Sequence, residues 1–76
     1  MTKRNAKKFY NMLSFVYPEA VITLNNGVSS YDAWVGVFNG VKCVDFTTWD
    51  MYDFDRALRV ARQGIEQSTK KEPRNA

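Results

Sequence analysis

The sequence predicts an α+β fold in which a three-stranded antiparallel β-meander is flanked by an N-terminal and a C-terminal helix, in the order α-β-β-β-α. Three observations lead to this prediction. Apolar residues recur at helical spacing over residues 3–16 and again over residues 54–65. An Asn39-Gly40 pair stands between two apolar, β-rich stretches, which is typical of a hairpin. A further β-branched stretch precedes the hairpin, so the two helices are expected to pack on one face of the sheet.

The first predicted helix covers residues 3–16. Its apolar positions follow the i, i+3, i+4, i+7 pattern of one buried stripe. Pro18 ends it, because the proline ring disfavours helical geometry at the preceding residue. The expected stripe consists of Ala6, Phe9, Tyr10, Leu13 and either Val16 or Tyr17.

The predicted strands occupy the middle of the chain. Residues 20–25 form the first strand, since they are rich in β-branched side chains. A turn follows over Asn25-Asn26-Gly27 and Ser29-Ser30. The two strands of the hairpin lie within residues 31–46, with Asn39 and Gly40 expected as its two loop residues.

The predicted hairpin register sorts the side chains onto two faces. It pairs Phe38 with Val41, Gly36 with Cys43 and Trp34 with Asp45. The other face is more uniformly apolar and is expected to form the core. If no element covers the first face, its aromatic residues make an exposed patch; if both faces are covered, Trp34 is a core residue. The core-facing set is Tyr31, Ala33, Val35, Val37, Lys42, Val44 and Phe46.

The second predicted helix begins near Asp50 or Asp53, either of which has the short acceptor side chain that an N-cap requires. Gly64 is expected to fray or end the helix, although Ile65 favours one more turn. Residues 1–67 are therefore predicted to form one compact domain, and residues 68–76 a polar mobile tail. The apolar stripe of the helix is Phe54, Ala57, Leu58, Ala61 and Ile65.

The composition of the 76 residues argues against most catalytic and metal sites. The chain has no histidine, and its one cysteine, Cys43, cannot form an internal disulfide. Asp45, Asp50, Asp53 and Asp55 do not follow the spacing of a calcium-binding loop. We therefore expect no enzyme activity, no cofactor and no metal. With no signal peptide and no membrane-spanning stretch recognised, a soluble cytoplasmic protein is expected.

The charge is segregated along the chain although the net charge is only +3. Residues 1–19 hold four basic residues and one acidic residue. Residues 31–55 hold one basic and five acidic residues, and residues 56–76 hold six basic and two acidic residues. Such segregation indicates distinct charged patches on the folded surface, or simply solvated helix faces and tails.

Docking onto a partner protein is the first functional hypothesis. An aromatic patch edged by carboxylates, in a small domain without catalytic groups, favours binding over chemistry. The protein would then block or bridge its partner, in the manner of phage or mobile-element inhibitors of host nucleic-acid-handling machinery. The residues predicted to bind the partner are Trp34, Phe38, Val41, Asp45, Trp49, Asp50 and Asp53.

A nucleic-acid-binding module is the alternative hypothesis. The element order resembles that of double-stranded-RNA-binding domains, but the acid-rich start of the last helix departs from their lysine-rich one. No membrane partner is expected. A homodimer, formed through the open sheet face or the edge strand over residues 20–25, is compatible with either function. The candidate phosphate-binding residues are Lys3, Arg4, Lys7, Lys8, Arg56, Arg59 and Arg62.

Overall fold

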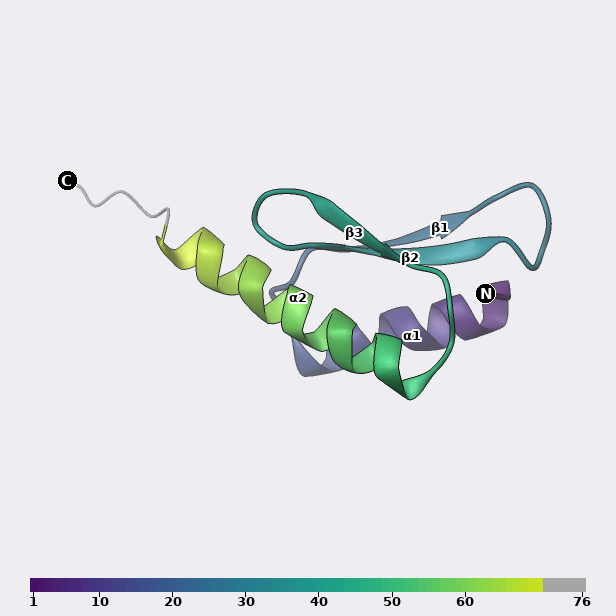
Figure 1. Ribbon diagram of the computed structural model, residues 1–76, viewed down its shortest axis with the longest axis horizontal. Coiled ribbons are helices and arrows are strands. Elements are labelled where there is room, and N and C mark those ends of the chain that lie inside the picture. The colour runs from purple at the N-terminus through teal and green to yellow at the C-terminus, as the bar shows by residue number, and fades with distance from the viewer. Residues whose placement is uncertain (71–76) are drawn as a thin grey trace.

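The computed structural model describes the backbone of residues 1–70 and the side chains of residues 1–68. It confirms the predicted order, with helix α1 (Lys3–Val16), strands β1 (Ile22–Asn26), β2 (Ala33–Phe38) and β3 (Cys43–Phe46), and helix α2 (Met51–Lys70). The strands form one antiparallel sheet in the order β1-β2-β3. Both helices lie on the same side of the sheet (Figure 1).

Helix α1 has the predicted bounds and a defined start. Thr2 is its N-cap, and the Thr2 hydroxyl accepts a hydrogen bond from the Asn5 amide at 3.1 Å. Ala6, Phe9 and Leu13 are fully buried, as the helical spacing predicts. The chain leaves the helix at Tyr17, one residue before the proline. The helix therefore presents one apolar stripe to the sheet and to α2, and its basic residues remain exposed.

The predicted register of the β2–β3 hairpin is wrong by two residues. Phe38 pairs with Cys43, not with Val41, and the Asn39 amide donates to the Lys42 carbonyl at 3.0 Å. The two central turn residues are thus Gly40 and Val41, and only Gly40 has a positive φ, of 96°. Glycine at the first central position with positive φ is typical of a type II′ turn.

The Asn39 side chain explains why the turn forms one residue later than predicted. Its carbonyl oxygen accepts hydrogen bonds from the Val41 and Lys42 amides at 2.8 and 2.9 Å. Because the register shift is an even number of residues, every strand residue keeps its predicted face. Tyr31 was expected on the core side but is exposed, since it precedes β2, and Lys42 belongs to the turn.

Helix α2 begins after Asp50, whose carboxylate accepts a hydrogen bond from the Asp53 amide at 2.7 Å. Of the two predicted outcomes at Gly64, the continuation that Ile65 favours is the correct one, and the helix runs on to Lys70. A Cβ atom at Gly64 would stand 2.2 Å from the carbonyl oxygen of Phe38. The glycine therefore lets α2 cross closely over β2. The helix includes the start of the predicted tail, and residues 71–76 lie outside the described residues.

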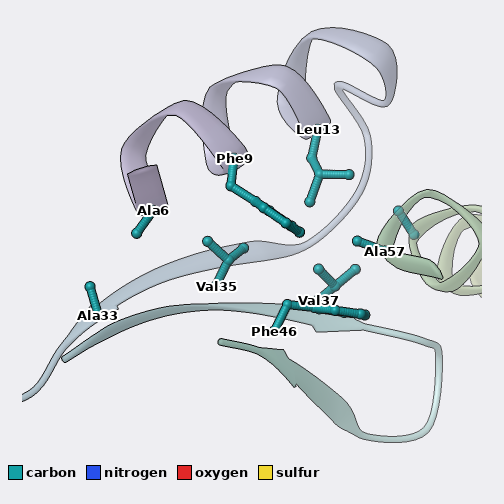
Figure 2. Close-up of a cluster of buried hydrophobic side chains, with 9 residues drawn as sticks. Ala6, Phe9, Leu13, Ala33, Val35, Val37, Phe46 and Ala57 are labelled. Carbon is teal, nitrogen blue, oxygen red and sulfur yellow. The ribbon is translucent and has the colours of Figure 1, made fainter. Parts of the chain in front are cut away.

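The core lies between the helices and the inner face of the sheet (Figure 2). Val35 and Val37 from the central strand lie at its middle, and Phe9 stacks on Phe46 with ring centroids 6.0 Å apart. Alanines on α2 let this helix approach the sheet closely. The buried apolar residues are Ala6, Phe9, Leu13, Ala33, Val35, Val37, Phe46, Ala57 and Ala61.

Candidate functional site

An apolar groove lies where the second half of α1 faces the start of α2. Two hollows, of about 210 and 310 Å³, adjoin there and share Met12 and Phe54 as lining residues. Large apolar side chains are unusually exposed around them: Phe15 at 87 % and Met51 at 77 %. We call this surface the α1–α2 groove and define it by Asn11, Met12, Phe15, Val16, Trp49, Asp50, Met51 and Phe54.

The groove is supported from below by the core. Phe9, which is fully buried, makes edge-to-face contacts with Trp49 and Phe54 at centroid distances of 6.0 and 5.4 Å. Trp49 is thus packed on its inner side while 42 % of it stays exposed. The aromatic floor of the groove is therefore held in place by the folded core, and its outer side is open to a ligand.

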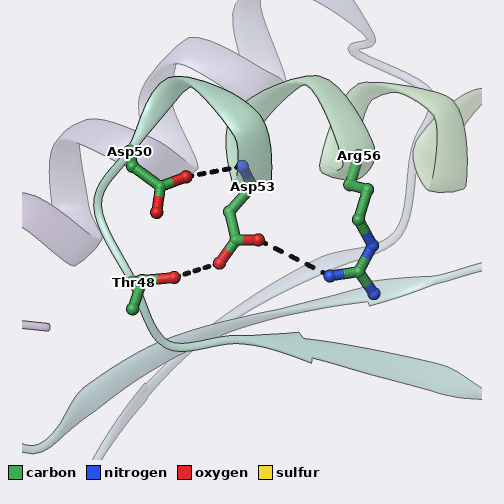
Figure 3. A network of polar contacts seen from close by, with 4 residues as sticks. All are labelled: Thr48, Asp50, Asp53 and Arg56. Carbon is green, nitrogen blue, oxygen red and sulfur yellow. Dashed lines mark hydrogen bonds and ion pairs between the residues drawn. The ribbon is translucent and has the colours of Figure 1, made fainter.

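A polar network fixes the start of α2 beside the groove (Figure 3). The Thr48 hydroxyl donates to the Asp53 carboxylate, which also pairs with Arg56 at 3.5 Å. The Arg56 guanidinium lies 5.1 Å from the centre of the Phe46 ring. The charge of Asp53 is therefore balanced within the molecule. Asp50 caps the helix through one oxygen and remains exposed, so it places a carboxylate at the edge of the groove.

The predicted partner-binding residues fall in separate places. Trp49 and Asp50 lie in the α1–α2 groove, whereas Asp53 is engaged in the polar network. Val41 is exposed in the β2–β3 turn. The remaining three share the outer face of the sheet, which neither helix covers, and there the two aromatic side chains are half-buried. These three residues are Trp34, Phe38 and Asp45.

The candidate phosphate-binding residues also divide into two groups. Arg56 and Arg62 form ion pairs within α2, Arg62 with Glu66 at 3.1 Å, while Arg59 is exposed. By contrast, α1 contains no acidic residue that would balance its bases. Four exposed bases with no acidic partner in their own helix therefore lie in the first two turns of α1. These side chains are Lys3, Arg4, Lys7 and Lys8.

Most of the groove residues were not predicted as site residues from the sequence. Met12, Phe15 and Met51 belong to no predicted buried stripe, and Phe54 was assigned to the core. The available signal was Phe15, a large aromatic residue on the side of a helix opposite its buried stripe. To predict that Phe15 lies near Met51, one must know how the two helices cross, and their contact residues are more than 30 positions apart along the chain.

The described residues offer little chemistry other than apolar contact at this site. Among them, no three or more acidic, cysteine or histidine side chains cluster as a metal site would require, and no helix is long and apolar enough to cross a membrane. Comparison with models of protein families, with curated protein sequences and with solved structures finds no match to this chain.

Proposed function

We propose that this chain is a non-enzymatic protein-docking domain that binds a partner protein in the α1–α2 groove. The observation that carries the proposal is the exposure of Phe15 and Met51 around an aromatic floor that the core already holds in place. Aromatic residues and methionine are enriched at the centres of protein interfaces. A prearranged apolar floor binds without first losing side-chain entropy, which favours affinity.

The charge at the groove edge indicates the chemistry of the partner. Asp50 lines the groove, and Asp55 lies one helical turn beyond Met51 on the same side of α2. A partner segment with an apolar stripe and adjacent Lys or Arg residues complements this edge. If the partner uses those basic residues to bind nucleic acid, docking displaces the phosphates. Inhibition of nucleic-acid-handling machinery is then a steric and electrostatic effect that needs no catalysis.

Site-specific photocrosslinking in the cells that produce the protein tests the proposal. A benzophenone amino acid replaces Phe15 or, as a matched control, Val28, which is fully exposed in the loop between β1 and β2. The expected result is an adduct with a second protein from position 15 and not from position 28. Adducts of equal yield from both positions, or no heterologous adduct from position 15, would refute docking in the groove.

Nucleic-acid binding remains the second candidate because the four bases of α1 have no acidic partner within that helix. Phosphate contacts by such a surface are not sequence-specific and weaken steeply as salt rises. Fluorescence anisotropy of short mixed DNA and RNA at low salt measures this property. An affinity that falls with salt and is lost in a Lys3→Glu/Lys7→Glu variant would rank this candidate above protein docking.

A further inference from the structure

The two walls of the α1–α2 groove carry opposite charge. On the α1 wall, Lys8 lies one turn before Met12 and two turns before Phe15, so it extends the same side of the helix. On the α2 wall, the exposed carboxylates Asp50 and Asp55 lie at the groove, and the first exposed base on that side, Arg59, comes one turn after Asp55. The groove thus has an apolar floor, a basic edge and an acidic edge.

We propose that in the free protein this groove is covered by a second copy of the chain, related to the first by a two-fold axis that runs along the groove. Such an axis places α1 of each copy over α2 of the other. The basic edge of each copy then meets the acidic edge of the other, and the contact occurs twice. A two-fold axis across the groove would instead set α1 against α1 and bring like charges together. Charge complementarity therefore selects the first arrangement.

Apolar contacts supply most of the stability of this dimer. In the selected arrangement, Phe15 of each copy faces the hollow lined by Trp49 and Phe54 of the other. An aromatic side chain buries about 150–250 Å² when it is enclosed, and here it does so twice. A single domain of this size has a small core, so removing these surfaces from water is a large gain relative to its own stability.

The inference depends on the groove and not on the function proposed for it. The second copy and a partner protein would compete for one surface, so the partner binds only after the dimer has opened. Dissociation of the dimer then limits the fraction of molecules that is ready to dock. This competition would make the apparent affinity for the partner weaken as the protein becomes more concentrated.

Sedimentation equilibrium over a wide range of protein concentration tests the dimer. We expect a mass that rises from 8.8 kDa toward twice that value with concentration. Phe15→Ser should raise the dissociation constant by about 30-fold or more, the effect of losing a central interface residue. Val28→Ser removes a fully exposed apolar side chain outside the groove and should leave the dissociation constant unchanged. A monomer at every concentration, or a dimer insensitive to Phe15→Ser, would overturn the proposal.

A charge-swap cycle tests the orientation of the two copies. Lys8→Glu and Asp55→Lys should each weaken the dimer by about tenfold, and the double variant should restore it, because the two edges meet between copies. Lys42→Glu in the β2–β3 turn is the matched control and should have no effect. Failure of the double variant to restore association would rule out a two-fold axis along the groove. Each variant is altered at an exposed site, and circular dichroism should show that it is folded.

The two proposals fail in different ways. A purely monomeric protein that still yields a heterologous adduct from position 15 would refute the dimer and support docking. A dimer with adducts only between copies of this chain would support the dimer and refute docking on another protein.

Discussion

Replacement of Gly64 by alanine sets helix propensity against close packing. In an exposed helix interior, alanine is more favourable than glycine by about 1 kcal/mol. At Gly64, however, the added Cβ would lie 2.2 Å from the Phe38 carbonyl oxygen, and ordinary contact begins near 3.4 Å. Helix α2 must therefore move by about 1.2 Å from the central strand, because the obstacle is backbone and cannot rotate away. Such overpacking costs about 1–3 kcal/mol, so after the gain of about 1 kcal/mol in helix propensity we expect a net loss of up to about 2 kcal/mol.

Urea denaturation followed by circular dichroism measures this loss as a lower midpoint at an unchanged slope. In a thermal melt, the same loss lowers the midpoint by up to roughly 15 °C for a domain of this length. Alanine and glycine placed in turn at the exposed neighbour Gln63 calibrate propensity alone, and there alanine should be the more stable. If alanine at position 64 stabilises the protein as much as it does at position 63, the argument from close approach is wrong.

Two further substitutions test the start of α2 and the β2–β3 turn. Asp50→Ala removes the helix N-cap and should destabilise the protein by about 1 kcal/mol, whereas Asp55→Ala, which caps nothing, should cost less in the same denaturation assay. Gly40→Ala forces a side chain into positive φ and brings a Cβ within 2.3 Å of Gln67, so we expect a loss of about 1–3 kcal/mol. Val41→Ala in the same turn should stay within about 0.5 kcal/mol of wild type, and equal losses at both turn positions would contradict the assigned turn.

The faces of the sheet could be predicted from the sequence although the register could not. Face depends on the two-residue period of a strand, and a shift of two residues leaves it unchanged. The register depends on whether Asn39-Gly40 or Gly40-Val41 occupies the centre of the turn. Both choices allow glycine a positive φ. The hydrogen bonds of the Asn39 side chain, which are local, and the pairing of Val35 with Phe46, which is not, together favour the second.

The groove could not be predicted from the sequence, for a related physical reason. A helical pattern shows which side of each helix is buried, as it did for Ala6, Phe9 and Leu13. It does not show how two helices cross, which side chains remain outside both contacts, or where those side chains meet. The role of Gly64 could not be predicted either. Locally, a glycine weakens a helix, but here it permits close packing against a strand more than 20 residues away.

The contacts of Phe9 determine when the groove forms during folding. This residue from the first helix touches Phe46, Trp49 and Phe54, which are between 37 and 45 positions later in the chain. Contacts of such sequence separation form late, because the intervening loop must close before they are gained. During synthesis, α1 emerges before α2, and the groove cannot form until α2 has been made. A partly made or truncated chain that lacks α2 therefore lacks one wall of the groove and Phe54 of its floor, so binding in the groove reports that folding is complete.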